Sequence, residues 1–194
     1  MPRRLEPFVE GFFYHVYNRG VDRQLIFFLD ANYTFFARRL EQYLRPGVRG
    51  IAYCLMPNHY HLLLLLEDDS SLQSAMHRLQ MSYAKAVNHS LGRVGPLFQG
   101  RFAARRVQST EGLLHLSRYI HLNPVAARIV DRPEDWPHSS YRCYLGLEGA
   151  AIVDPSVLLD TLSPDVALVA QRRQYRDFVE EDLGRVRSLD AEAL

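Results

Sequence analysis

The chain has 194 residues, 47% of them hydrophobic and 23% charged, which is typical of one packed soluble domain. Its two cysteines are too few for a disulfide scaffold or a zinc cluster. The net charge of +1 divides unevenly, because residues 1–150 carry 18 Lys and Arg against 13 Asp and Glu, whereas residues 151–194 carry 5 against 9.

The first third of the chain predicts a strand, a helix and a hairpin. Residues 12–17 alternate and are rich in aromatic side chains, which favours a strand. Asp30 is a suitable N-cap for a helix over residues 31–44, whose apolar side chains recur on one helical stripe. Residues 50–56 and 59–66 indicate two further strands, and the short Pro-Asn turn between them predicts an antiparallel hairpin.

The next part of the chain predicts a helix, a loop, a strand and a second helix. Residues 72–91 have helical periodicity and end at a glycine, and residues 93–100 form a glycine-bracketed loop. Residues 101–108 favour a strand. Residues 112–122 favour a helix that should stop at Asn123-Pro124, because proline disrupts a helix interior.

The order of these elements is β-α-β-β-α-β-α. The first six match the split β-α-β arrangement of a ferredoxin-like fold, in which two helices cover one face of an antiparallel sheet and the first and third strands are central. We therefore expect an α+β domain over residues 1–150, with an additional helix after the last strand. Residues 151–194 should form an acidic, helical C-terminal extension whose role the sequence leaves open.

A histidine pair opens the third strand, where the sequence reads His59-Tyr60-His61. Side chains alternate between the faces of a strand, so His59 and His61 project to one side and Tyr60 to the other. Two imidazoles whose backbones are roughly 7 Å apart can converge on one metal ion. Histidines at the start of a buried strand are also often structural, so the pair alone leaves both roles open.

The last predicted helix carries His115, Tyr119 and Asn123, each four residues apart and therefore on one face. A tyrosine hydroxyl, with an ordinary pKa of about 10, is a poor nucleophile unless a metal polarises its electrophile. If this helix lies against the sheet, Tyr119 can point at an ion held by the histidine pair, and Asn123 can offer an amide oxygen as third ligand. His115 is expected to be only a neighbour. Taken singly, Tyr119 is better explained as a half-buried structural tyrosine and Asn123 as a helix C-cap, and only their joint arrangement favours the functional role.

Four motifs, in this order, resemble the REP-associated tyrosine transposases, a branch of the HUH single-tyrosine transposases that act on single-stranded DNA. They are Y-H-V-Y-N-R-G at residues 14–20, M-P-N-H-Y-H at 56–61, G-P-L-F-Q-G-R-F at 95–102 and Y-I-H-L-N-P-V at 119–125. The resemblance covers roughly residues 10–145 and includes W-P-H-S-S-Y at 136–141.

The resemblance implies a metal-dependent single-stranded DNA endonuclease and strand transferase that acts on hairpins formed by repetitive extragenic palindromes. His59 and His61 match the metal ligands, with Mg²⁺ or Mn²⁺ as cofactor. Tyr119 matches the nucleophile, which leaves a 5′-phosphotyrosine and a free 3′-hydroxyl. Asn123 aligns with a further metal contact, where related transposases often have Gln. Tyr60 takes a middle position that is usually hydrophobic, and we reject it as nucleophile.

Arginine supplies all but one of the 23 cationic side chains, and it binds phosphates in bidentate geometry and stacks on bases. A GC-rich genome gives the same bias, so composition only favours nucleic acid. The candidate DNA contacts are Arg19, Arg23, Lys85, Arg93, Phe98, Arg101, Arg105 and Arg106. Each cation taken singly also fits a solvated surface charge, and Phe98 fits either a base-stacking platform or an anchor of its loop.

The partner we expect is single-stranded or hairpin DNA, bound by a monomer or homodimer in the cytoplasm. Residues 1–10 lack the apolar core of a signal peptide, and the leucine run at 62–66 is too short to span a membrane. The main alternative is a catalytically silent regulator that binds hairpin DNA. A phosphoesterase for small molecules fits less well, because no acidic cluster accompanies the histidines. The DNA sequence recognised, catalysis within one chain or across a dimer, and mobilisation against processing of host repeats stay open.

Overall fold

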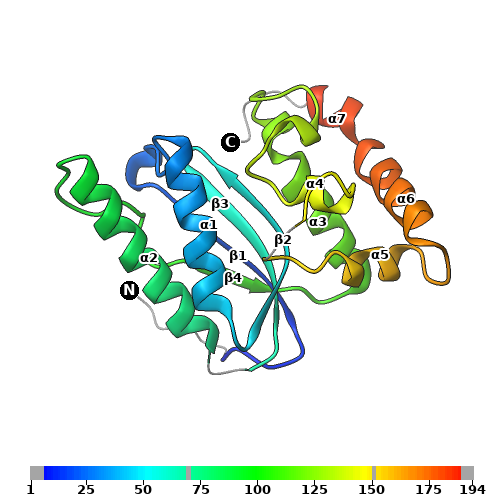
Figure 1. Ribbon diagram of the computed structural model, residues 1–194, viewed down its shortest axis with the longest axis horizontal. Coiled ribbons are helices and arrows are strands. Elements are labelled where there is room, and N and C mark those ends of the chain that lie inside the picture. Colours follow the sequence, from blue (N-terminus) through cyan, green and yellow to red (C-terminus); the bar gives the residue numbers. More distant parts are fainter. Residues whose placement is uncertain (1–6, 69–70, 150–151, 189–194) are drawn as a thin grey trace.

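The computed structural model describes residues 7–68, 71–149 and 152–188. A four-stranded antiparallel sheet with the order β2-β3-β1-β4 lies between two layers of helices (Figure 1). The strands are β1 (Phe13–Arg19), β2 (Val48–Met56), β3 (His59–Leu66) and β4 (Ala103–Arg106). The predicted α+β, ferredoxin-like sheet is confirmed, with the first and third strands at its centre.

The helices divide between the two faces of the sheet (Figure 1). One face is covered by α1 (Asp30–Leu44) and α2 (Ser71–Ser90). The other layer is formed by α3 (Thr110–Ala126), α4 (Tyr141–Tyr144), α5 (Ser156–Leu162), α6 (Leu168–Glu180) and α7 (Leu183–Ser188). Two short 3₁₀ turns, η1 (Val21–Arg23) and η2 (Pro133–Asp135), lie in the connections. No helix among the described residues is both long and apolar enough to cross a bilayer.

The leucine-rich strand β3 is continuously apolar because both faces of the sheet are covered. Leu62 and Leu64 belong to the core beneath α1 and α2, whereas Leu63 belongs to the core beneath α3. This alternation sends His59 and His61 to the α3 side, with Leu63. The position of β3 between β1 and β2 also fixes its neighbours, since His61 pairs with Tyr17 on one side and Cys54 on the other.

Two predicted helix boundaries are wrong. Helix α3 does not stop at Asn123-Pro124 but continues to Ala126, with Pro124 inside it. The missing proline donor costs one hydrogen bond in the last turn, and the burial of Leu122 and Val125 in the core offsets that loss. The second error is at the start of α1, where Asp30 is the first helical residue and not the N-cap. The predicted strand at residues 101–108 is also shorter at both ends, as β4 shows.

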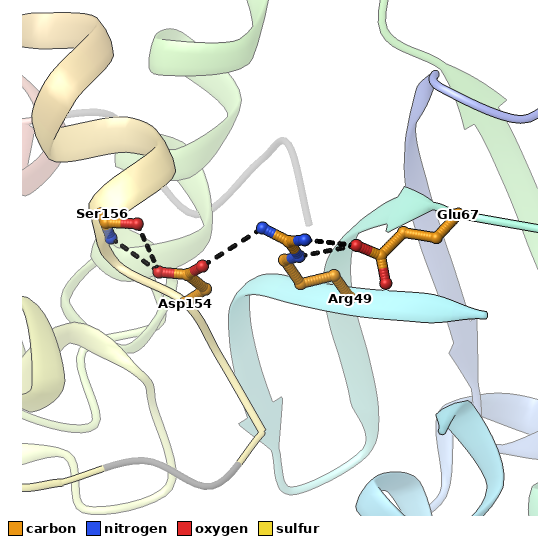
Figure 2. Close-up of polar contacts among 4 residues, drawn as sticks. All are labelled: Arg49, Glu67, Asp154 and Ser156. Atoms are coloured by element: carbon orange, nitrogen blue, oxygen red, sulfur yellow. Dashed lines mark hydrogen bonds and ion pairs between the residues drawn. The ribbon is translucent and has the colours of Figure 1, made fainter. Parts of the chain in front are cut away.

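The start of the C-terminal extension is tied to the edge of the sheet (Figure 2). The guanidinium of Arg49, on edge strand β2, pairs with Glu67 on one side and with Asp154 on the other, the latter at 3.3 Å. Asp154 in turn accepts hydrogen bonds from the backbone and hydroxyl of Ser156, at 3.0 and 2.6 Å. The Asp154 N–H also donates to the Gly50 carbonyl. The chain leading into α5 is therefore anchored on β2.

Acid should destabilise the fold through its buried histidine His121. Burial lowers the pKa of His121 to about 3, whereas an unfolded histidine titrates near 6.5. Between these values only the unfolded chain binds the proton, so we expect the free energy of unfolding to fall, as pH falls, by about 1.4 kcal/mol per pH unit from this residue. Urea unfolding at pH 7 and pH 5 measures it. In His121→Gln, the free energy of unfolding should depend less steeply on pH, by the slope that corresponds to about one proton. Equal slopes in the variant and the wild type would contradict this assignment.

Candidate active site

The histidine pair lies side by side at the start of β3. The ring centroids of His59 and His61 are 5.0 Å apart. Tyr60, between them, points into the opposite core, where it is fully buried against Phe36 and accepts a hydrogen bond from Gln80. Burial raises the pKa of Tyr60, which further removes it as a nucleophile. The strand alternation predicted from the sequence therefore holds at this site.

Helix α3 brings the predicted tyrosine to the histidine pair. The ring of Tyr119 lies 5.3 Å from that of His61, edge to face, and the side chain is 48% exposed. One turn further on, the buried Asn123 lies close enough to His59 to affect the pKa of that histidine, and its Nδ2 donates to the Tyr119 carbonyl at 3.1 Å. The two predicted ligand types and the candidate nucleophile thus meet. His115 instead contacts Arg118, as expected for a neighbour.

Hydrogen bonds on one ring nitrogen of each histidine leave the other nitrogen for a ligand. His59 Nδ1 lies 2.6 Å from Asn58 Oδ1, and Asn58 uses its Nδ2 to donate to the Arg23 carbonyl. His59 Nδ1 must therefore donate, which leaves a lone pair on Nε2. His61 Nδ1 lies 2.9 Å from His15 Nε2, which leaves the Nε2 of His61. Partners of this kind orient metal-binding histidines.

Burial keeps both histidines in the neutral form that binds metal. It is the largest cause that lowers the pKa of His61, to about 2, and nearby His59 and His15 lower it further. Burial is also the largest cause that lowers the pKa of His59, against the opposing effect of the neighbouring Asn123 side chain. Neutral imidazole offers a lone pair, whereas the charged form does not. The pair is therefore ready to bind a cation without first losing protons.

The donor set fits a divalent cation. Because Asn123 Nδ2 donates to a carbonyl, its Oδ1 is the atom left to face His59. Two imidazole nitrogens and one amide oxygen suit Mn²⁺ or a similar ion and leave positions open for substrate oxygens. Among the described residues, no group of three or more His, Cys, Asp or Glu side chains could hold a metal. The third protein ligand of a metal at this place would therefore be the asparagine amide.

Two site residues on β1, His15 and Tyr17, were missed from the sequence. His15 bonds to His61, and the ring of Tyr17 lies 5.9 Å from that of His61. The alternation of the Y-H-V-Y segment already placed both side chains on one face. Their meeting with His61, however, depends on the register that pairs Tyr17 with His61, and the sequence does not reveal register.

The histidine pair and Tyr119 line an open groove of about 720 Å³. Three predicted DNA contacts, Arg19, Arg23 and Arg101, also line it. Arg19 is held by a hydrogen bond to Gln99. Arg105, on β4, is close enough for its charge to lower the pKa of His15, after the larger effect of burial. The groove therefore joins the candidate chemistry to a cationic wall.

The remaining predicted DNA contacts do not line this groove. Lys85 is exposed on α2, in the helix layer across the sheet from Tyr119. Arg93 lies over the ring of Phe28, and Arg106 over that of Phe12. Phe98 does not line the groove either.

Phe98 is buried, with 7% exposure, and packs near Tyr60 and Tyr83 in the core beneath α1 and α2. Its backbone also bridges to Gly20. This packing supports the alternative in which Phe98 anchors its loop. Base stacking requires an exposed ring face, and a residue with 7% exposure offers little of one.

Comparison with known proteins gives matches of three kinds. A family model described as "Transposase IS200 like" matches residues 9–123. A Haemophilus influenzae protein named "Putative REP-associated tyrosine transposase" is 28% identical over 101 residues, which cover 47% of this chain and 57% of that protein. The chain thus spans little more than half of that relative. A solved structure of a REP-associated tyrosine transposase bound to a REP hairpin matches this chain with a TM-score of 0.63 and 21% identity. The match covers 75% of this chain and 86% of the chain in that structure. The resemblance indicated by the four motifs is confirmed.

Proposed function

Because the chain belongs to the family of IS200-like transposases, we propose that it is a metal-dependent single-stranded DNA endonuclease and strand transferase. The observation that carries this proposal is the convergence of Tyr119, from α3, with His59 and His61, from β3, in one open groove. Tyr119 and the two histidines come from separate elements, and the stability of the fold gives no evident reason for these side chains to meet in a groove. A DNA substrate also agrees with action in the cytoplasm.

The substrate we propose is a hairpin formed by a repetitive extragenic palindrome. The curated relative carries the name of a REP-associated transposase, and the matching solved structure holds a REP hairpin. The groove at Tyr119 is open and lined by arginine, which suits an exposed phosphodiester backbone. Single-stranded DNA next to the hairpin would lie along it.

In the proposed reaction, Tyr119 Oη attacks phosphorus and loses its proton. The new bond joins tyrosine to the 5′-phosphate, the P–O3′ bond breaks, and the released 3′-oxygen takes up a proton. His59, His61 and Asn123 would hold Mg²⁺ or Mn²⁺, which neutralises charge on a phosphate oxygen. One phosphodiester is exchanged for another, so reversal or joining to a new strand needs no ATP.

The direct test is incubation of the wild-type protein with labelled hairpin DNA, carrying a single-stranded flank, in Mn²⁺ or Mg²⁺. We expect a protein–DNA adduct that survives denaturing electrophoresis, together with a released fragment bearing a 3′-hydroxyl. Protein that shifts the hairpin in a native gel but never cleaves it would overturn the proposal in favour of the catalytically silent regulator.

Arg101 should contribute to hairpin affinity through the phosphate backbone. It lines the groove beside Tyr119, and loss of one phosphate contact lowers the slope of log K against log salt by about one. Arg101→Gln should therefore weaken hairpin binding severalfold at low salt, as measured by fluorescence anisotropy in a salt series. The matched control is Arg38→Gln, an exposed arginine on α1 across the sheet. Equal affinities and slopes for the two variants would rule out this contact.

A further inference from the structure

Helix α3 is held by contacts on the side opposite Tyr119. Ser117 and His121 lie two positions before and two after Tyr119, so each is about 160° around the helix from it. Both are fully buried, whereas Tyr119 is exposed to the groove. The helix thus presents Tyr119 on one side and two buried polar side chains on the other, about 3 Å before and after it along the axis.

A single hydroxyl from the C-terminal extension contacts both of these buried side chains. Tyr175, on α6, donates to Ser117 Oγ at 3.0 Å, and its Oη lies 3.0 Å from His121 Nδ1. The Ser117 hydroxyl itself donates a hydrogen bond to the Leu114 carbonyl at 2.7 Å. Tyr175 Oη must therefore accept from His121 Nδ1, so that this tyrosine both donates and accepts.

The other side of His121 is fixed to the sheet. His121 Nε2 lies 2.8 Å from Ser140 Oγ, and that oxygen accepts the backbone N–H of Tyr53, on β2, at 2.8 Å. The Ser140 hydroxyl has two acceptors within reach, His121 Nε2 at 2.8 Å and the Tyr53 carbonyl at 3.2 Å. With Nδ1 of His121 as donor, its Nε2 is free to accept from Ser140. The result is one satisfied chain of hydrogen bonds that links β2, α3 and α6. Such buried networks specify one arrangement of the elements they join.

A second contact of the extension lies beside the first. Arg118, immediately before Tyr119, is largely buried and donates to the Phe178 carbonyl at 3.1 Å. Its Nε lies 3.2 Å from the carboxylate of Asp182. The extension therefore contacts α3 at Ser117, Arg118 and His121, and none of its described residues lines the groove.

We propose that α6 positions the nucleophile: Tyr175, acting through Ser117 and His121, fixes the rotation of α3 and so the place of Tyr119. This inference rests on the proposed function. A turn of about 10° would move a phenol oxygen, roughly 8 Å from the helix axis, by about 1.4 Å. A misplacement near 1 Å can cost on the order of 100-fold in rate. The acidic extension, whose role the sequence left open, would thus serve to position Tyr119.

The test compares Tyr175→Phe with Tyr144→Phe. Tyr144 is a matched control, because it is also fully buried, stacks on Tyr175 at 4.5 Å, and donates its hydroxyl to the Ile51 carbonyl of β2 instead of to α3. Both variants lose one buried hydroxyl and should lose similar stability in urea. At saturating hairpin DNA, Tyr175→Phe should cleave about 10-fold to 100-fold more slowly, with hairpin affinity within twofold of wild type. Tyr144→Phe should retain both rate and affinity.

Hydrogen–deuterium exchange of residues 110–126 gives a readout that does not need activity. Exchange in this helix should be faster in Tyr175→Phe than in wild type, and unchanged in Tyr144→Phe. A normal cleavage rate with normal exchange in Tyr175→Phe would overturn the inference, as would equal loss of rate in both variants. If the wild-type protein never cleaves hairpin DNA, the proposed function fails, and exchange alone decides whether α6 holds α3.

Discussion

Tyr119→Phe should abolish covalent capture of hairpin DNA and leave hairpin binding within about twofold of wild type. The change removes only the attacking oxygen, and the phenyl ring can keep its edge-to-face contact with His61 at 5.3 Å. Stability should hardly change, because the side chain is half exposed. Loss of a nucleophile typically lowers the rate by at least about 10⁴-fold. Denaturing electrophoresis with labelled DNA measures the adduct, and a native gel shift measures binding.

The matched control for this experiment is Tyr17→Phe. Tyr17 is a second tyrosine in the same groove, near the same histidine. Its removal should still permit the adduct, because the family resemblance matches the nucleophile to Tyr119, on α3, and not to Tyr17, on β1. An adduct that persists in Tyr119→Phe and disappears in Tyr17→Phe would reassign the nucleophile.

Replacement of either groove histidine should remove metal binding and cleavage together. His59 and His61 supply both imidazole nitrogens of the proposed site, so either variant leaves only one imidazole and an asparagine amide to hold the ion. We expect His59→Ala and His61→Ala to lower Mn²⁺ affinity by at least about 100-fold, since even the loss of an orienting partner costs 10-fold to 100-fold. Electron paramagnetic resonance of free Mn²⁺ measures this affinity. Chelation of the metal should likewise stop cleavage by the wild-type protein.

His115→Ala provides the control for the histidine variants. His115 is exposed on the same helix as Tyr119 but contacts Arg118 instead of the histidine pair. It should keep both Mn²⁺ affinity and cleavage. Cleavage that continues in excess chelator, or Mn²⁺ binding that survives the loss of His59 and His61, would show that the ion is held elsewhere.

Much of the candidate site was predictable because it depends on local periodicity. The two-residue repeat of a strand placed His59 and His61 on one face, and the four-residue spacing in a helix placed Tyr119 beside Asn123. The same periodicities located the main helices and the central strands. Errors arose where an isolated signal competed with packing, as when Pro124 failed to end α3 because its neighbours are buried.

The side chains that the sequence could not place are those whose roles depend on a distant partner. Phe98 fitted either a platform for bases or an anchor, and its burial beside Tyr60 favours the anchor. Lys85 satisfied the same charge criterion as Arg101, yet of the two only Arg101 lines the groove. Charge and residue type are visible in the sequence, whereas the face of the fold that carries them is not.

The sequence by itself determined which side chains share a face of each element, because backbone geometry repeats every two residues in a strand and every 3.6 in a helix. The tertiary structure alone decided which faces meet. The contact of His15 with His61 needs the register of β1 on β3, and the contact of Tyr175 with His121 joins residues 54 apart. Such contacts follow from the packing of whole surfaces, to which many residues contribute at once.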